Sequence, residues 1–500
     1  MKTPTRIQNI LILQKIFIIS ILCVLPLPEF AFCADNSTVP LKKMSLSESI
    51  ALALRKNSTI EIAFLDRVTQ KFDLKVAEDK FVPKLTLSST VQTKPITTDG
   101  WKNIKGIGEF TATATETLPT GALITLTTSR ATDKDNASDP NHSKTDSWNL
   151  SVTQPLLKGG GIEANTASVQ IARMTEKTNL LTLKTTITDT ITYVIWAFRS
   201  FLQASKQVEI NRRALERAKS IVSISKALIE AGRMAELEIV QAEAEVANRE
   251  LQLLTAVNAE DNAKIALAKL IDIDVNTQFR AEETLGETPA VPAFEALKRT
   301  AFEKRPDLIS YALAVNIAKL NYAVAKNNRL WDLSLFGSYE RKLVAGGLEV
   351  YGADTKTWNS GVKLTIPLRD LTLKQNYIFA KINLEKAEIN LKKLRDNVEL
   401  EIKDALRDYE IKLKQMKLSQ HSSKLYEKKL EIEREKLRAG RSTNFQVVYA
   451  QNDLFNAQIA ELTAVISFLN AQSALDKTIG TTLDRWNISA VDRYGEEKFK

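Results

Sequence analysis

Two long stretches of the chain contain no glycine and no proline, the two residues that most strongly disfavour a helix interior. They run from Ile162 to Ala231 and from Leu368 to Ala439. At 1.5 Å per residue, each stretch could form a helix roughly 100 Å long. A globular core has no use for a helix of that length, so we predict an elongated wall of helices.

Both stretches end in the same tripeptide, Ala231-Gly232-Arg233 and Ala439-Gly440-Arg441. Glycine costs about 1 kcal/mol inside a helix, but it is the usual left-handed cap where a helix ends. After each tripeptide, residues at coiled-coil spacing predict a returning helix. These residues are Leu237, Val240, Ala244, Ala247, Leu251 and Leu254 in the first case, and Phe445, Val448, Asn452, Phe455, Ile459 and Leu462 in the second. We therefore predict two helical hairpins that turn at Gly232 and Gly440, each packed along this seam.

The hairpins belong to an internal repeat. "LSESIALALRKNS" aligns with "FEALKRTAFEKRP", "SVTQPLL" aligns with "KLTIPLR", and "LTAV" occurs twice. The short helices before the strands and after the turn together match the long helix in length, so we expect them to stack end to end beside it. The predicted divisions are a signal peptide (1–33), a leader (34–44), repeat 1 (45–270), a linker (271–292), repeat 2 (293–480) and a polar tail (481–500).

Alternating polar and apolar residues precede each long helix. In "KLTLSSTV", Leu85, Leu87 and Val91 share one face, with threonine and serine on the other. Period two in such runs predicts strands, at about 84–156 and 331–366. Each strand is expected to be about as long as the roughly ten residues that cross an outer membrane. The pattern leaves open whether repeat 1 adds two or four strands, because "ATETLPTGALIT" fits either a barrel turn or a hairpin outside the barrel.

Aromatic residues near the predicted strand ends suit the interfacial girdle of a membrane barrel. They are Trp148, Trp331, Tyr339 and Trp358. Membrane sheets cannot leave edges unpaired, and single-chain barrels need about eight strands. Four to six strands per chain therefore predict a barrel shared by several chains. Periodicity alone also allows a soluble β-sandwich beside a coiled coil.

The N-terminus has the pattern of a secretory signal peptide. Three cations, Lys2, Arg6 and Lys15, precede the apolar run "IFIISILCVLPLPEFAFCAD", and cleavage is expected near Cys33 or Ala34. A spanning helix and a lipid-modified Cys33 are the alternatives. Both cysteines, Cys23 and Cys33, lie in this segment, so the mature chain is expected to lack disulfides and thiolate metal sites.

Charge and motifs argue against nucleic-acid binding and catalysis. The net charge of +9 falls to +7 without the signal segment, which carries three cations and Glu29. Basic residues are interspersed with acidic ones, which indicates a solvated surface. His142 and His421 lie in polar surroundings, and "KGGGIEAN" lacks the GK[ST] of a phosphate loop. We predict no catalytic residues, no metal, no cofactor and no enzyme activity.

The order of these segments resembles the TolC-like outer-membrane efflux proteins, or outer membrane factors, across nearly all of the mature chain. The likeness is carried by "LSESIALALRKNS", "AEDKFVPKLTLS", "TQPLLKGGG", "TIPLRD" and the paired "AGR" steps. The resemblance implies a mainly α fold with β, built from two tandem repeats. Long coiled-coil hairpins would form a periplasmic barrel, and the strands would join a shared trimeric β-barrel.

The resemblance also implies a function and partners. A homotrimer would sit in the lipid of a Gram-negative type outer membrane and extend into the periplasm. It would be the passive exit duct of a tripartite efflux or type I secretion system. The expected partners are a periplasmic adaptor, also called a membrane fusion protein, and an inner-membrane RND or ABC transporter.

Family resemblance assigns roles to residues at and after the turns. Ala231, Gly232, Arg233, Ala439, Gly440 and Arg441 would form the adaptor-docking tips. Acidic residues after these turns ring the narrow aperture in the family, and Glu238 matches one such position. Gln446 and Tyr449 stand where aspartates are expected, and Asp453 is the nearest acid. These four are the aperture candidates, unless they are ordinary polar residues that flank a coiled coil.

Two other classes of protein are alternatives to the channel. A periplasmic coiled-coil adaptor or scaffold would have long hairpins without a membrane barrel, but such proteins usually carry a single hairpin between split lipoyl halves. An enzyme acting on envelope polymers would need a paired-acid or nucleophile motif, which the sequence lacks. The exported substrate and the class of transporter cannot be read from the sequence.

Overall fold

The computed structural model describes residues 42–98, 101–135, 143–283, 291–346, 352–439 and 441–488. All of them belong to one unit, Lys42–Lys500. The predicted signal peptide and the end of the polar tail lie outside the described residues. So do Cys23, Cys33, His142 and Gly440.

The first repeat begins with short elements and ends with a long hairpin. Its elements in order are β1 (Lys42–Ser45), α1 (Leu46–Lys56), α2 (Ser58–Glu78), the 3₁₀ turn η1 (Asp79–Phe81), β2 (Lys84–Thr98), β3 (Trp101–Thr117), β4 (Leu123–Asp135), β5 (Ser143–Pro155), α3 (Ile162–Glu230) and α4 (Leu237–Ile271). A short strand, β6 (Phe279–Glu282), follows and pairs in parallel with β1.

The second repeat has the same order with fewer strands. Its elements are α5 (Phe294–Lys304), α6 (Pro306–Asn328), β7 (Asp332–Ala345), β8 (Ala353–Thr365), α7 (Leu371–Arg438), α8 (Asn444–Ile479) and the short α9 (Thr482–Arg485). The long helices α3 and α7 have 69 and 68 residues. Each ends just before an Ala-Gly-Arg step, because no earlier residue in either stretch interrupts the helix.

Side-chain caps define several helix starts. The Ser45 hydroxyl accepts the Glu48 N–H at 3.2 Å, while the Glu48 carboxylate accepts the Ser45 N–H at 2.9 Å. This reciprocal capping box opens α1. Asn57 caps α2 and Asp370 caps α7 through their side-chain oxygens. Pro306 occupies the first turn of α6, where a missing N–H costs nothing.

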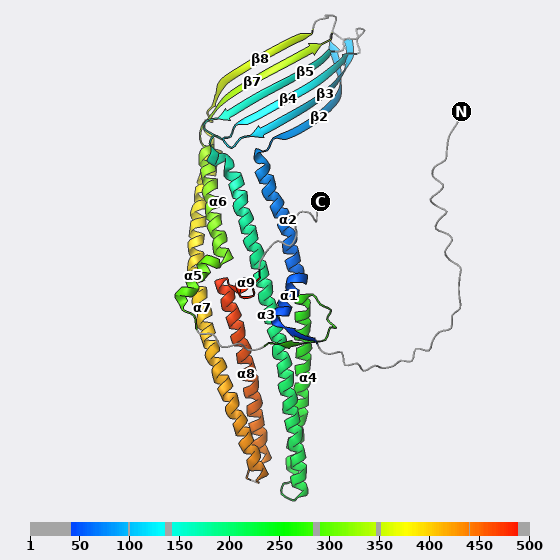
Figure 1. Cartoon of the computed structure of the whole chain (residues 1–500), viewed down its shortest axis with the longest axis vertical. Helices are drawn as coiled ribbons and strands as arrows, with labels where there is room; N and C mark the ends of the chain where they lie inside the picture. Colours follow the sequence, from blue (N-terminus) through cyan, green and yellow to red (C-terminus); the bar gives the residue numbers. More distant parts are fainter. Residues whose placement is uncertain are drawn as a thin grey trace, which may run out of the picture. The chain divides into compact units, whose positions relative to one another are not determined.

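Six antiparallel strands form one sheet in the order β2-β3-β4-β5-β7-β8 (Figure 1). Repeat 1 contributes four of them, so the hairpin around "ATETLPTGALIT" is part of the sheet. The strands have 13 to 17 residues, which is longer than predicted. The reason is that the strands stay paired along their whole length. For example, β2 and β3 remain in register from Lys84↔Thr115 to Thr98↔Trp101.

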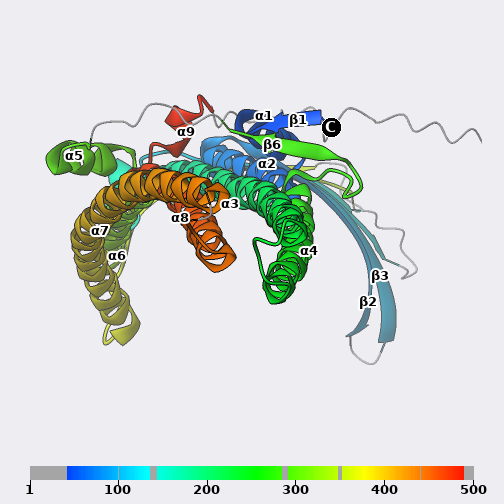
Figure 2. The ribbon, with the colours of Figure 1, turned by 90° about the horizontal axis from the view of Figure 1, so that it is seen from below.

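Short helices pack end to end along each long one. The helices α2 and α4 both contact α3, and α6 and α8 both contact α7 (Figure 1). In addition, α8 and α6 pack on α3, which joins the two repeats. The helical wall therefore runs α7, α8, α3, α4 at its lower end (Figure 2).

The main core lies near the middle of α3, under α1, α4, β1 and β6. Ile191, Phe198 and Leu267 are completely buried there. Arg199 is also buried and pairs with Glu283 at 3.2 Å. Its guanidinium donates to the Leu469 carbonyl oxygen of α8. The hydrogen bond to Leu469 thus ties α3 to the second repeat. Without these partners the buried charge of Arg199 would be unsatisfied.

The predicted coiled-coil seam of α4 is wrong for the α3–α4 pair. Leu251 and Leu254 are 64% and 69% exposed. The buried residues in the lower part of α4 recur every seven positions at Ala242, Arg249 and Ala256. The Arg249 side chain reaches α8, where it hydrogen-bonds Asn452. The apolar stripe that looked like the seam faces away from α3.

The corresponding stripe of α8 packs only in part. Val448 is buried, but Phe445 is exposed. The α8 residues that pack deepest at the tip are Val447, Ala450 and Leu454, in a cluster shared with α7. The seam is displaced because α8 contacts α3 as well as α7 and must bury two faces.

Candidate channel wall and tip turns

The strand register separates the sheet into two chemically different faces. Directly opposed residues share a face, and alternation carries that face along each strand. One face is apolar and bears Leu85, Leu87, Val91, Phe110, Leu126, Leu150, Val152, Leu335, Val362 and Leu364. The opposite face is mostly hydroxyl and amide, with Thr86, Ser88, Thr113, Thr125, Thr127, Ser151, Ser338 and Asn359.

The apolar face is exposed in the single chain. Val91 is 87% exposed, and Leu85 and Val362 are also among the exposed large hydrophobic residues. Large contiguous apolar surfaces are rare on soluble monomers. Apolar-out, polar-in alternation is the pattern of a membrane barrel wall.

Three of the four predicted interfacial aromatics lie together on the apolar face. Trp148 and Tyr339 stack edge to face with centroids 5.1 Å apart, and Tyr339 lies 4.4 Å from Trp358. They sit near the middle of their strands rather than at the ends, because the strands extend past them. Trp331 immediately precedes β7 at the helix end of the sheet. Eight extended residues from Trp331 to Tyr339 span about 27 Å along the strand, which is roughly 20 Å of membrane height at the usual tilt of about 40°.

The sheet has two edges that no other described strand covers, the outer sides of β2 and β8. Unpaired N–H and C=O groups are costly in lipid. The helices α6 and α8 are also apolar and long enough to cross a membrane. Both pack along α7 and α3 instead, so the sheet carries the surface suited to lipid.

The first tip turn is a helix C-cap of the Schellman type. The Arg233 N–H donates to the Leu228 carbonyl at 2.8 Å, and the Gly232 N–H donates to the Ile229 carbonyl at 2.8 Å. Gly232 has φ +69°, a conformation that other residues adopt only with strain. A Cβ at this position would meet nothing within 4 Å, so the turn projects into open space. Ala231 and Arg233 are exposed beside it.

The second tip turn shares one backbone hydrogen bond with the first, between the residues on either side of Gly440. The Arg441 N–H reaches back to the Lys436 carbonyl at 2.8 Å. Thr443 caps α8 by accepting the Gln446 N–H. Hydrogen bonds from Lys436 and Ser442 hold the pKa of Glu433 below its usual value. Ala439 and Arg441 are exposed at this tip.

Two of the aperture candidates, Tyr449 and Asp453, contact Lys429, which the sequence did not single out. The Lys429 ammonium of α7 pairs with Asp453 at 2.7 Å and lies 5.2 Å from the Tyr449 ring centroid. The hydrogen bond from Lys429 to Asp453 raises the pKa of that lysine. The negative charge of Asp453 is therefore balanced by a lysine of its own hairpin. Lys429 lies 24 positions before Asp453, so only the fold of the hairpin reveals the pair.

The other two aperture candidates differ in environment. Glu238 stands in the first turn of α4, half-buried, with its N–H bonded to Ala235. Gln446 is exposed and its Oε1 lies 3.0 Å from the Ser442 hydroxyl. The structure thus keeps the asymmetry between the two repeats. A charged residue follows the first turn, and an amide follows the second.

Arg249 of α4 links the two hairpins by contacting α8. Its guanidinium hydrogen-bonds Asn452 of α8 and lies 4.4 Å from the Phe455 ring centroid. It also pairs with Glu245 at 2.7 Å on its own helix. Sequence reasoning missed it, although an arginine at a seven-residue spacing between two alanines was a possible signal.

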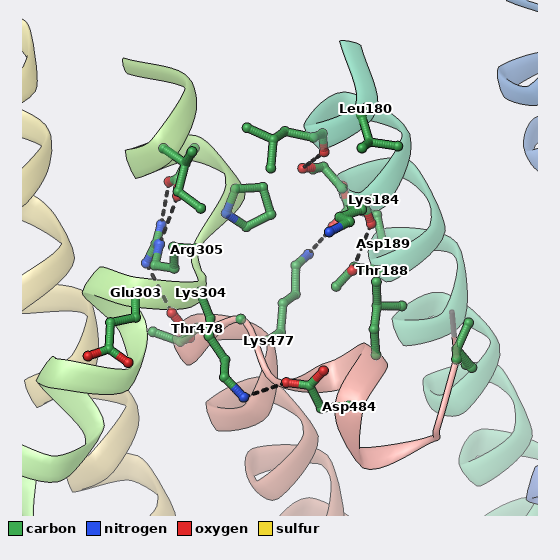
Figure 3. A pocket seen from close by; sticks show the side chains of 18 of the residues that line it. Leu180, Lys184, Thr188, Asp189, Glu303, Lys304, Arg305, Lys477, Thr478 and Asp484 are labelled. Atoms are coloured by element: carbon green, nitrogen blue, oxygen red, sulfur yellow. Dashed lines mark hydrogen bonds and ion pairs between the residues drawn. The ribbon is translucent and has the colours of Figure 1, made fainter. Parts of the chain in front are cut away.

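A cavity of about 850 Å³ lies between α3, the start of α6, and α8 with α9 (Figure 3). Its charges pair with one another: Lys477 with Asp189 at 2.8 Å, and Lys304 with Asp484 at 2.6 Å. Arg305 is shared between Asp307 of α6 and Glu401 of α7. These pairs account for seven of the nine charged side chains that line the cavity. Among the described residues there is also no group of three or more His, Cys, Asp or Glu that could hold a metal.

An exposed apolar sheet joined to two long helical hairpins defines the subunit of a membrane channel. The chain belongs to the outer membrane efflux protein family, whose profile matches residues 50–272 and 297–481. It is thus an outer-membrane channel protein of efflux systems, as the sequence resemblance predicted.

Solved structures of outer-membrane channels share this fold. The CmeC channel of Campylobacter jejuni has a TM-score of 0.65 at 19% identity, covering 91% of this chain and 88% of that one. VceC of Vibrio cholerae has a TM-score of 0.64 at 16% identity, covering 87% and 96%. The open state of MtrE from Neisseria gonorrhoeae gives 0.61 at 16%, covering 87% and 88%. A search of curated protein sequences gave no match.

Proposed function

We propose that three copies of this chain close one β-barrel and one helical tunnel, which together form the passive exit duct of a tripartite efflux or type I secretion system. The observation that carries this proposal is the six-stranded sheet with an exposed apolar face, a polar opposite face and two open edges. In lipid those edges must pair. At one end of the sheet β2 begins as β8 ends, so β2 of one copy would lie antiparallel to β8 of the next.

The strand count sets the size of the proposed barrel. Six strands from each of three copies make eighteen, an even number that keeps every neighbouring pair antiparallel. Barrels of 16 to 18 strands leave an aqueous channel. The polar face of threonine, serine and asparagine would line that channel, and the apolar face would contact outer-membrane lipid, with Trp148, Tyr339, Trp358 and Trp331 at its interfaces.

The helices offer matching surfaces for the same assembly. The stripe of α4 is exposed, and α7 carries a second exposed stripe at seven-residue spacing, Ile411, Leu418, Leu425 and Ile432. Both stripes begin near the tips, and α4 and α7 are the two ends of the helical row (Figure 2). A contact between α4 of one copy and α7 of the next joins two different surfaces. Repeated by rotation, such a contact closes a ring of copies.

The first experiment separates the channel from a periplasmic adaptor or scaffold. A channel should fractionate with outer membranes, migrate as a heat-modifiable trimer in detergent and give ion conductance in a planar bilayer. Recovery as a soluble periplasmic protein without conductance would refute the duct.

We further propose that the tip turns dock a periplasmic adaptor, which couples the duct to an inner-membrane RND or ABC transporter. Arg233 and Arg441 are exposed at the two turns, and a Cβ at Gly232 would meet nothing within 4 Å. Proline cannot adopt the positive φ of Gly232, so Gly232→Pro with Gly440→Pro should deform the tips. The expected result is loss of adaptor crosslinking and transport with normal trimer assembly. Full transport and crosslinking would overturn the docking role.

The aperture is proposed to lie just above the tips, at Glu238, Gln446, Tyr449 and Asp453. The ion pair with Lys429 balances the charge of Asp453. It therefore favours an aperture closed by large side chains and hydrogen bonds over one closed by a ring of unpaired carboxylates. Alanine at Gln446, Tyr449 or Asp453 should raise single-channel conductance. Unchanged conductance and ion selectivity in all three variants would rule out a gate at this level.

A further inference from the structure

A groove of about 840 Å³ lies between α3 and α7, with α8 as its floor. Its walls belong to different hairpins, which α8 joins by packing on both. The groove is lined by six basic and three acidic side chains, an excess of three positive charges. Its volume is within the range of small-molecule sites.

Two basic groups of the groove, Arg217 and Arg434, lack a partner among the described residues. Nε and Nη2 of Arg217 are buried and have no hydrogen-bond partner among the described residues. Arg434 enters the groove from the opposite wall, half-buried, and forms no ion pair within the described part of the chain. A buried guanidinium without a partner costs stability, so such groups are normally paired.

The surrounding charges make this arrangement more unfavourable. Burial lowers the pKa of Arg217, and the neighbouring Arg249, Arg434 and Arg213 lower it further. Arg213 and Arg249 have carboxylate partners in Glu209 and Glu245. Arg217 has none at hydrogen-bonding distance among the described residues. The groove is therefore short of negative charge beside Arg217.

We propose that this groove binds a small polyvalent anion, one that carries several phosphate or carboxylate groups. Guanidinium groups present paired N–H donors that match the oxygens of such anions. Arg217 and Arg434 would grip the anion from the two walls, and Lys424 and Lys428 would meet it at the rim. Because the walls come from two hairpins, the bound anion would fix α3 relative to α7.

Binding is tested on the full chain in detergent by calorimetric titration with tripolyphosphate and citrate, at constant pH and 50 mM or 300 mM chloride. One anion per chain is expected, with weaker affinity at high salt. Arg217→Gln or Arg434→Gln should weaken binding at least tenfold, since each removes a charge-assisted contact. Arg212→Gln is the matched control, because Arg212 is exposed on α3 and does not line the groove. An equal loss in the control would mean non-specific attraction and overturn the proposal.

Thermal unfolding separates a ligand site from a structural role. Arg217→Gln removes an unpaired buried charge, so the anion-free variant should melt no lower than the wild type. The variant should also lose the stabilisation that tripolyphosphate gives the wild type. A variant that melts lower without the anion and keeps the full shift would contradict the site. Binding of a glutamate-rich helical peptide, with none of either small anion, would show a protein-docking surface instead.

Discussion

Replacing Leu251 and Leu254 of α4 by alanine tests whether the exposed stripe of this helix is a contact between copies. In one chain these side chains are 64% and 69% exposed and face away from α3. Their truncation removes little packing within the subunit. Alanine also favours helix at least as well as leucine, so α4 itself should not be weakened.

The expected loss follows from the area available for burial. Fully burying a leucine contributes about 1.5–3 kcal/mol, and about two thirds of each side chain is free to be buried at a contact. Each leucine should then contribute roughly 1–2 kcal/mol, and the pair about 2–4 kcal/mol per interface. Three interfaces in a ring multiply this to about 6–12 kcal/mol per trimer.

The assay is the trimer-to-monomer transition in detergent, followed by heating before electrophoresis and by sedimentation. The double variant should dissociate at a markedly lower temperature while its monomer keeps the helical circular dichroism of the wild type. Glu243→Ala is the control, because this exposed α4 residue faces Lys226 of α3 at 3.8 Å. A trimer as heat-stable as the wild type, or an equal effect of the control, would refute the interface.

Two further predictions concern ion pairs in the helical wall. Arg199→Met should lower the free energy of unfolding by about 3–5 kcal/mol, because it leaves the Glu283 carboxylate without its cation near the core. In a denaturant titration, adding Glu283→Gln should recover part of this loss. No recovery would contradict the pairing. Hydrogen bonds from Lys298 and Lys403 lower the pKa of Glu399 to about 2. The stability it contributes is thus fully present above pH 4.5 and lost as pH falls towards 2. The difference in melting temperature between wild type and Glu399→Gln should shrink over that range, and a constant difference would disprove the linkage.

Several features of the fold depend on residues close in sequence and were predictable for that reason. The long glycine-free stretches became α3 and α7, and the strand segments showed their alternation of polar and apolar residues. The turn at Gly232 follows from the backbone freedom of glycine at a helix end. Each of these signals is set by local sterics and by the period of one element.

Features that depend on which distant segments meet were not predictable in this way. The stripe at Leu251 has the spacing of a seam, yet the buried side of α4 is the one that bears Ala242 and Arg249. Periodicity identifies an apolar face but not its partner, because the partner's shape and the closeness of backbone approach decide the packing. The number of strands in one sheet likewise depended on hydrogen bonds between β5 and β7, from different repeats.

The sequence by itself determined two repeated hairpins, membrane-type strands and the family of the chain, because these are carried by local pattern and its repetition. Only the tertiary structure decided the charge at functional positions. Asp453 looked like a free acid until α7 placed Lys429 beside it. Arg217 looked like one surface cation among many until three helices enclosed it without a partner. Electrostatic energy depends on distance and burial in space, which spacing along the chain does not supply.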